Sequence, residues 1–181
     1  MTTPSIYEQA MGSGFSQLAS AIQRFHGLTG RHKLHGWVST EAPATLLGKL
    51  LAMLLGAPTK TGKGPIKFVL DAQGAKEVWT RHFPFKTMAS TLSEEGGRIV
   101  ERLGVARLSF HLAASEGMLV LRLQDMRFLG LPCPRCLMPA VLAEETGGEN
   151  KLHFKVMASL PFIGRVVSYN GYLNVPDEAT R

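Results

Sequence analysis

The stretch RLSFHLAASEGMLVLRL, residues 107–123, decides the fold class. Its first half places apolar side chains at every second position, and the alternation resumes at Leu119 after the short turn 115–117. A period of two is typical of a strand that buries one face, and two such runs joined by a short turn pair as a hairpin. The sequence therefore predicts an antiparallel β architecture.

The same alternation recurs along most of the chain. It predicts further strands at 31–40, 65–71, 76–84, 86–93, 97–103, 151–158 and 165–175. About ten strands with one apolar face each, joined mostly by short turns, favour antiparallel pairing, and so many strands seldom stay flat. We expect an α+β fold that is mainly antiparallel β: a strongly curved sheet, barrel or half-barrel over residues 65–175, with two early helices packed against it.

The first helix is predicted over residues 5–26, where apolar residues recur at spacings of three and four. Ser5 followed by Glu8 has the pattern of a capping box, which marks a helix start. Gly12 and Gly14 interrupt the pattern, and each costs about 1 kcal/mol relative to alanine inside a helix. We therefore expect a kink or break near these two glycines.

Residues 43–56 predict a second helix with two contrasting faces. One face is formed by Leu47, Leu50, Leu51 and Leu54, and the other by small residues and Lys49. A membrane span needs about 20 apolar residues, so this run is too short, and interfacial helices usually carry several Lys or Arg rather than one. We expect a helix packed against the sheet, and the alternative is a hydrophobic lid over a cavity.

Length and composition indicate one soluble domain covering residues 1–181. Hydrophobic residues make up 45% of the chain and charged residues 19%, which is enough for one core without disulfides. The first 15 residues lack the basic and apolar segments of a secretory signal, and the chain has only two cysteines. We therefore expect a cytoplasmic protein with no transmembrane segment.

The net charge of +6 raises the question of nucleic-acid binding. Lys and Arg exceed Asp and Glu by five to two in residues 1–60 and by ten to seven in residues 61–127, and both number five in residues 128–181. A groove that neutralises several phosphates gathers its cations on one face. Because this excess is spread along the chain, we expect a mildly basic surface and no nucleic-acid partner.

The two cysteines, Cys133 and Cys136, form a C-x-x-C pattern in the proline-rich stretch 129–139. A structural zinc site needs two more ligands at matching spacing, and there is no second C-x-x-C. A redox pair needs its first cysteine at the start of a helix, which Pro132 and Pro134 disfavour. We expect a crossover with buried cysteines and neither metal nor cofactor; a metal or redox role for the pair is the alternative.

The stretch KEVWTRHF carries the best candidates for ligand binding. Glu77, Trp79 and Arg81 alternate onto one strand face, so an aromatic ring lies between a carboxylate and a guanidinium. Such a set can stack on and orient a flat or anionic ligand. We add Glu101 as a partner from a neighbouring strand and Tyr169 as a further polar group of the concave face. The alternative is a surface ladder of cross-strand pairs.

Six short motifs follow one another between Tyr7 and Val175: YEQAMGSGFSQL, RFHGLTG, EVWTRHF, VERLG, RFLGLPCPRCLMP and SLPFIGRVVSYNGYLNV. Their order resembles the bacterial family catalogued as domain of unknown function 4166. The resemblance implies no established activity. It implies that the prolines and leucines of 129–139, and not the cysteines, belong to the motif. Family members also occur C-terminal to Rossmann-type NAD(P)-binding domains, which implies an NAD(P)-binding oxidoreductase as a partner.

Three hypotheses for function follow. We favour a non-enzymatic module that holds an apolar or lipid-like small molecule on its concave face and serves a separate oxidoreductase. The second is a protein–protein interaction domain that uses exposed sheet or the helix Leu47–Leu54. The third is an enzyme of unknown reaction that uses Glu77 or Glu101 as acid or base. The inward residues can also pack against the helices and leave no cavity, and the sequence does not separate these cases.

Overall fold

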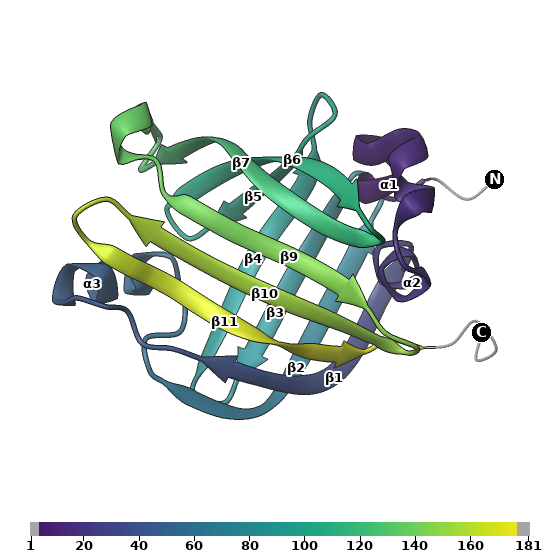
Figure 1. Ribbon diagram of the computed structural model, residues 1–181, viewed down its shortest axis with the longest axis horizontal. Helices are drawn as coiled ribbons and strands as arrows, with labels where there is room; N and C mark the ends of the chain where they lie inside the picture. The colour runs from purple at the N-terminus through teal and green to yellow at the C-terminus, as the bar shows by residue number, and fades with distance from the viewer. Residues whose placement is uncertain (1–3, 177–181) are drawn as a thin grey trace.

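The computed structural model describes residues 4–176 and is a closed antiparallel barrel (Figure 1). Its strands are β1 (Gly30–Thr40), β2 (Gly62–Gln73), β3 (Lys76–Phe83), β4 (Lys86–Glu94), β5 (Ile99–Leu103), β6 (Ala106–Ser115), β7 (Met118–Phe128), β8 (Leu131–Pro132), β9 (Ala140–Gly147), β10 (Lys151–Leu160) and β11 (Gly164–Asn174). Ten strands follow the order β6-β5-β4-β3-β2-β1-β11-β10-β9-β7, and the β6–β7 pairing closes the circle. The short β8 adds to β7. The predicted fold class is confirmed in its closed form.

The hairpin that the sequence predicted is β6–β7. Its strands meet at the pair Ser115 and Met118, and the turn between them is Glu116–Gly117. Both turn residues have positive φ, 52° and 80°. Two central residues with positive φ form the mirror-image turn whose twist matches that of the flanking strands. The same hairpin supplies the closing seam of the barrel.

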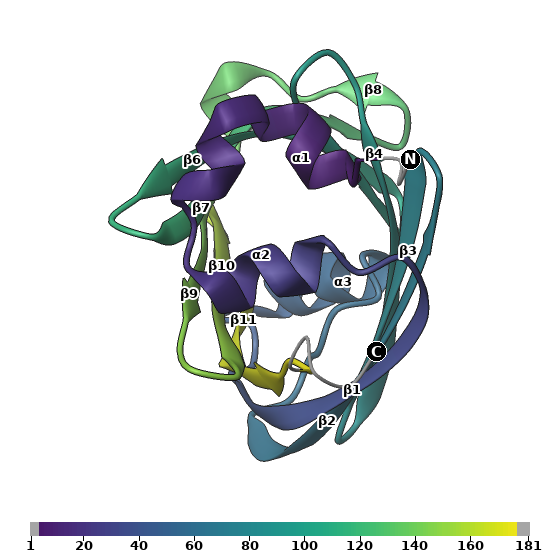
Figure 2. The ribbon, with the colours of Figure 1, turned by 90° about the vertical axis from the view of Figure 1, so that its right-hand side faces the viewer.

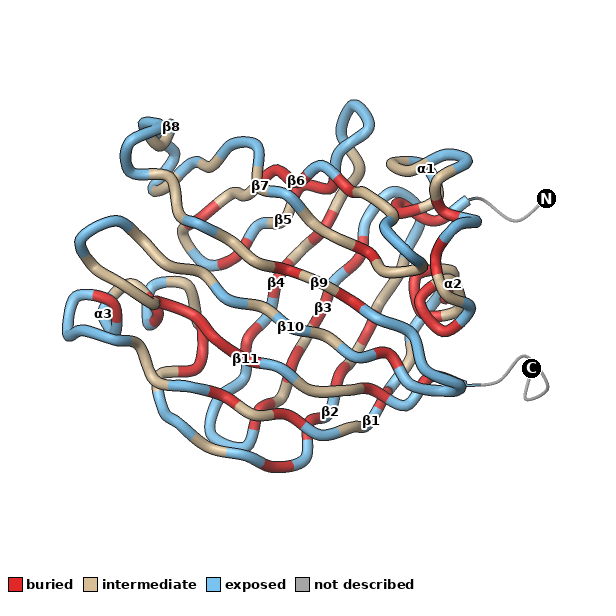
Figure 3. The backbone as a smooth tube through the Cα atoms, viewed as in Figure 1, coloured by how far each residue is buried: buried red, intermediate tan, exposed pale blue. Residues whose placement is uncertain are grey.

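Buried and less buried residues alternate along much of the sheet, as the colours along the strands of Figure 3 show. In β3, for example, Glu77, Trp79, Arg81 and Phe83 are buried, whereas Lys76 is exposed. A strand with this pattern buries polar side chains together with apolar ones whenever they share parity. The interior is therefore mainly apolar but contains a group of polar residues.

The predicted helix 5–26 is broken into three pieces, first at Gly12, as expected, and again at Leu18 and Ala19. The pieces are α1 (Ile6–Met11), a 3-10 helix (Gly12–Gln17) and α2 (Ser20–His26). Ser5 and Glu8 make both hydrogen bonds of the capping box. Figure 2 views the barrel from the end that these pieces cover, which we call the α1–α2 end.

Helix α3 (Leu46–Leu54) lies at the opposite end of the barrel, here called the α3 end (Figure 1). A Cβ at buried Gly48 would be 3.1 Å from the backbone oxygen of Arg165 in β11. At the other end of the helix, a Cβ at Gly104 would overlap the backbone oxygen of Leu54. The helix therefore reaches from the β10–β11 turn to the β5–β6 turn, across the end of the barrel.

The leucine-rich face of α3 points away from the barrel. Leu46, Leu47, Leu50 and Leu54 are exposed, whereas Gly48 and Ala52 are buried. The helix packs on the fold as expected, but it does so through its small residues, because these let the backbones approach closely. The alternative of a hydrophobic lid over a cavity stays a prediction, because the exposed leucines do not face the barrel.

Strand β9 is the main element that the sequence did not predict. Its second half reads Glu144-Glu145-Thr146-Gly147, and acidic residues and glycine are rare in strands. The other boundaries differ from the predicted ones by a few residues: α3 is shorter than 43–56, and the barrel after β1 covers 62–174 rather than 65–175.

Candidate functional site

A cavity of about 140 Å³ lies inside the barrel. Much of its wall is apolar and includes Met88, Leu92, Ile99, Leu121, Val156 and Val167. A dry cavity of about 150 Å³ is large enough to hold benzene. The inward side chains therefore do not fill the barrel completely, and α3 contributes to the enclosure because Leu55, at its C-terminal end, lines the cavity.

Arg81 is the cation of the cavity wall. Its Nη1 donates a hydrogen bond to Ser90 Oγ at 3.0 Å, and its Nη2 lies 3.4 Å from Glu101 Oε1. The guanidinium carbon also lies 5.0 Å from the centre of the Trp79 ring. Burial acts to lower the pKa of Arg81, but Tyr169, Glu101 and Tyr7 outweigh burial and raise it. The guanidinium therefore stays charged inside the barrel.

His26 links α2 to β9 across the α1–α2 end of the cavity. Its Nε2 lies 2.7 Å from Glu145 Oε2, and its ring stacks on Tyr7 with centroids 3.7 Å apart. Among the residues the structure describes, His26 Nδ1 and Tyr7 Oη are buried without a hydrogen-bond partner. Burial, followed by the charges of Glu145, Glu77 and Glu101, raises the pKa of Tyr7 well above its usual value, so the phenol keeps its proton.

Glu77 lies behind Trp79, outside the cavity wall. Its Oε2 accepts a hydrogen bond from Trp79 Nε1 at 2.8 Å. Burial raises the pKa of Glu77, and Glu145 adds to the rise, while His26 and the indole hydrogen bond act in the opposite direction. Glu77 lines instead a cleft of about 260 Å³ beside the start of α1, together with Ser5.

A second cavity of about 50 Å³ shares part of the wall of the first. Trp79, Arg81, Glu145 and Tyr169 line both. These four side chains therefore separate the two cavities, and we call them the polar partition. The polar partition lies beneath the α1–α2 end.

The structure brings the five predicted site residues together. Trp79, Arg81, Glu101 and Tyr169 line the cavity, and Glu77 is bonded to Trp79. The surface-ladder interpretation is wrong, since the strand face that carries them points inward. Their part in ligand binding stays a prediction. Arg81 pairs with Glu101, but Glu101 does not come from the neighbouring strand as predicted, because β4 lies between β3 and β5.

Three residues that contact the predicted site residues or line the same cavity were not predicted from the sequence. They are Tyr7, His26 and Glu145. Tyr7 belongs to the apolar stripe of the first helix, and such a stripe does not reveal which member meets a polar neighbour. Glu145 continues the inward alternation of Val141 and Ala143, and that pattern is the one signal that was available. Pairing of His26 with Glu145 depends on contact between residues far apart in the chain.

Residues 18–173 match the model of a family described as a domain of unknown function, DUF4166. The chain belongs to this family. The resemblance seen in the six motifs is thereby confirmed. No curated protein matches the chain.

Among solved structures, the crystal structure of Rv2717c from M. tuberculosis is similar to this DUF4166 barrel, with a TM-score of 0.50. The two chains are 10% identical, and the alignment covers 88% of this chain and 99% of the other. At this identity the likeness shows the fold alone. Within residues 4–176, no helix is long and apolar enough to cross a membrane.

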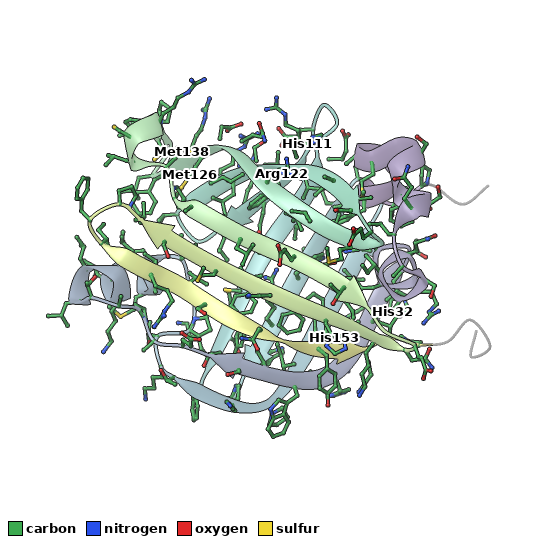
Figure 4. All side chains as sticks on the ribbon, viewed as in Figure 1. His32, His111, Arg122, Met126, Met138 and His153 are labelled. Atoms are coloured by element: carbon green, nitrogen blue, oxygen red, sulfur yellow. The ribbon has the colours of Figure 1, made fainter. Side chains whose placement is uncertain are left out.

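The cysteines of this DUF4166 protein lie outside the barrel, in the crossover between β7 and β9. Cys133 is partly exposed and Cys136 is exposed, next to a 3-10 helix at Arg135–Leu137. The expectation of buried cysteines is wrong, because the proline-rich crossover projects from the α3 end. In the described part of the chain, no three His, Cys, Asp or Glu residues are grouped so as to hold a metal ion. The histidines, which are the other common metal ligands, are also dispersed: Figure 4 shows His111 on β6, apart from His32 and His153.

Strands β7 and β9 separate toward the α3 end. They pair only between Leu119–Leu121 and Ala143–Glu145, and β7 then pairs with β8 instead. Two cavity-lining residues, Met126 and Pro139, belong to the separated parts. Figure 4 labels Met126 and Met138 at this end of the barrel. The cavity therefore extends from the polar partition toward the α3 end.

Proposed function

We propose that this DUF4166 protein is a non-enzymatic module that binds a small, mainly apolar molecule inside the barrel. The observation that carries the proposal is the cavity of about 140 Å³, whose wall is mainly apolar. Its polar members are Tyr7, Arg81, Glu101, Glu144, Glu145 and Tyr169. Small-molecule sites commonly have this composition, with a few polar groups that set orientation.

The volume of the cavity favours a ligand about the size of a single six-membered ring. Sites for drug-sized molecules occupy about 300–1,000 Å³, whereas a cavity near 150 Å³ holds benzene. A long lipid chain would need the separated part of β7 and β9 to open further. We therefore narrow the expected ligand from lipid-like molecules in general to a single ring or a short branched chain.

The buried hydroxyl of Tyr7 favours a ligand that carries a hydrogen-bond acceptor. Tyr7 lines the cavity, and its buried hydroxyl has no partner among the described residues. A buried donor without a partner costs about 1–3 kcal/mol, which an acceptor on the ligand would recover. Arg81 is already paired with Glu101 and bonded to Ser90, so a second charge on the ligand has no free counterpart there. A neutral polar group is favoured over a carboxylate.

An enzyme in the same cavity is the second candidate, and the raised pKa of the buried Glu77 is the observation that favours it. Glu77 lines a different cleft from the apolar cavity, however, and Glu101, which does line it, is paired with Arg81. No serine, threonine or cysteine is among the described residues that line the cavity. These placements rank the binding module above the enzyme. An oxidoreductase partner is a further proposal that rests on the family resemblance.

The first experiment is native mass spectrometry of the gently purified protein, with its denatured mass as reference. An organic adduct that is lost on denaturation is the expected result, and its mass gives the ligand class. Benzene, phenol and benzoate then serve as probes of similar size, with binding followed by isothermal titration calorimetry. We expect phenol to bind about tenfold more tightly than benzene and benzoate to bind worst.

A matched pair of variants places the probe in the barrel. Ala143→Leu adds three carbons to the cavity wall, and Ala89→Leu makes the same change on the exposed face of β4. Loss of phenol binding in Ala143→Leu alone supports the proposal. Absence of any adduct together with absence of binding by all three probes contradicts it. Turnover of the copurified ligand would favour the enzyme.

A further inference from the structure

Three arginines stand in one row across neighbouring strands at the α3 end. Arg102 of β5 is directly opposite Arg107 of β6, and Arg107 is directly opposite Arg127 of β7. Residues that are directly opposite point to the same face of the sheet, and Arg102 and Arg127 are exposed, so this row lies on the outer surface. Together with the β5–β6 turn and Gly130, the three arginines line a cleft of about 480 Å³.

The pairing within the barrel does not explain this arginine row. Like charges directly opposite each other destabilise a sheet. Arg107 is compensated, because it bonds to Glu95 at 2.6 Å and lies 4.0 Å from Asp125. Arg102 and Arg127 have no ion pair with any described residue. Their guanidinium groups are available for an anion, and guanidinium groups match phosphate geometry particularly well.

The arginine row belongs to an end of the barrel that is basic as a whole. The connections at the two ends, each taken with two flanking residues on either side, differ in charge. The α3 end comprises residues 39–63, 82–87, 102–107, 127–141 and 159–165, with nine Lys or Arg against one acid. Glu95 and Asp125 lie outside these ranges but contact Arg107, so they reduce the charge excess beside the row. The opposite end comprises residues 4–31, 72–77, 93–100, 114–119, 146–152 and 173–176, with five against six. Folding therefore gathers a charge excess that looks dispersed in the sequence.

The same end exposes large apolar side chains beside these cations. Leu129, Leu131 and Leu137 are exposed in the crossover after β7, next to Gly130 of the cleft, and the outer leucines of α3 are exposed as well. Phe162, at the β10–β11 turn, is fully exposed, with 101% relative accessibility. Leu129 and Phe162 also hold φ of 51° and 63°. Glycine or asparagine suits such positions better, so neither burial nor turn geometry accounts for these two side chains.

We propose that the α3 end docks on an anionic lipid bilayer, with the arginine row holding a phospholipid phosphate and the neighbouring leucines and Phe162 inserting among the acyl chains. Apolar side chains ringed by Lys and Arg are the composition of a membrane-interface surface. The sequence argument against an interfacial helix was that α3 carries a single cation; in the fold, the neighbouring connections supply the others. A nucleic acid would match the arginines but would leave the leucines exposed to water. The surface does not depend on whether the cavity is occupied.

The test is co-sedimentation with 100 nm vesicles of phosphatidylcholine alone or with about 30% phosphatidylglycerol. We expect binding to the anionic vesicles that weakens as salt is raised, and at least tenfold weaker binding to the neutral ones. Arg102→Glu combined with Arg127→Glu should weaken binding about tenfold or more. Arg31→Glu combined with Lys76→Glu makes the same change in net charge at the opposite end and is the matched control.

A second pair of variants tests insertion. Leu131→Ser combined with Phe162→Ser should weaken vesicle binding about tenfold, and Val78→Ser combined with Trp37→Ser, which changes exposed side chains on the barrel wall, should not. All the substituted positions are exposed, so circular dichroism should report an unchanged fold for every variant.

Three outcomes overturn the proposal. One is equal loss of binding in the Arg31→Glu/Lys76→Glu control, which would reduce the effect to net charge. Another is binding of inorganic phosphate or glycerol phosphate at the arginine row with no vesicle binding, which would make the cleft a site for a soluble anion. The third is a dimer in solution that Leu131→Ser and Phe162→Ser dissociate, since that would assign the apolar surface to a second copy of the chain.

Discussion

Both ends of the barrel carry large apolar side chains, but these side chains are buried at the α1–α2 end and exposed at the α3 end. At the α1–α2 end, aromatic side chains point inward: Phe25 packs edge-on against Phe68 and Trp79, with ring centroids 5.5 and 5.8 Å apart. At the α3 end, glycine and alanine face the barrel and the leucines face solvent. The first end therefore completes the core, whereas the second presents an apolar surface to something outside the chain.

This difference shows that an amphipathic helix does not reveal which of its faces is buried. A helix of small and large residues can pack closely through the small ones or bury area through the large ones. In α3 the close approach of Gly48 to the backbone of Arg165 decides the orientation. Stability should therefore depend strongly on the α1–α2 end and weakly on the exposed leucines, and the following variants test that asymmetry.

Phe25→Ala should have the largest effect on stability. The side chain is 1% exposed, and truncation of a buried phenylalanine costs about 3–5 kcal/mol through lost contacts and the cavity left behind. Leu50→Ala, at a position that is 49% exposed, should change the free energy of unfolding by no more than about 0.5 kcal/mol. Urea denaturation of both variants measures the contrast, and a loss above 2 kcal/mol for Leu50→Ala would show that the leucine face is buried after all.

Arg81→Met should destabilise by about 3 kcal/mol, because it leaves the mostly buried Glu101 without its cation. Arg98→Met removes a cation from the exposed pair with Asp125 and should have almost no effect. The double variant Arg81→Met/Glu101→Leu should recover much of the loss, since both charges are then gone. Failure of the second substitution to recover stability would mean that packing of the guanidinium on Trp79 matters more than its charge.

Most of the barrel could be predicted from the sequence because strand alternation is a local signal. The face that carries Glu77, Trp79 and Arg81 was identified from β3 alone, and its inward direction followed only when the sheet closed. Glu145 was missed because its strand ends in residues typical of a turn. The arginine row was missed for a different reason: Arg102, Arg107 and Arg127 become neighbours only through the register of three strands.

Gly48→Val should cost about 1–2 kcal/mol, because the added carbons meet the backbone oxygen of Arg165 and force α3 away from the barrel. The loss should be local, so hydrogen exchange should speed up in residues 46–55 before it does elsewhere. Gly14→Ala is the counterpart at the α1–α2 end: its Cβ would meet only Met11 Cε at 3.9 Å, and stability should hold or rise by a few tenths of a kcal/mol. Uniform exchange in Gly48→Val would contradict a lid that moves separately from the barrel.

The pH dependence of stability should also distinguish the two ends, and here the effect is smallest. Burial raises the pKa of Glu77 above its ordinary value of 4.5, so the folded protein keeps this proton to a higher pH than the unfolded chain does. The contribution of Glu77 to stability is therefore complete below pH 4.5 and is lost as pH rises through the folded-state pKa. The arginines of the α3 end do not titrate in this range.

Glu77→Gln carries no titrating proton but keeps an oxygen to accept from Trp79 Nε1. In this variant the free energy of unfolding, measured by urea denaturation from pH 4 to pH 7, should fall less with rising pH than in the wild type. The exposed Glu116→Gln is the matched control and should keep the wild-type slope. If Glu77→Gln kept that slope too, the pKa of Glu77 would not differ between the folded and the unfolded chain, and the carboxylate behind Trp79 would be ionised at neutral pH.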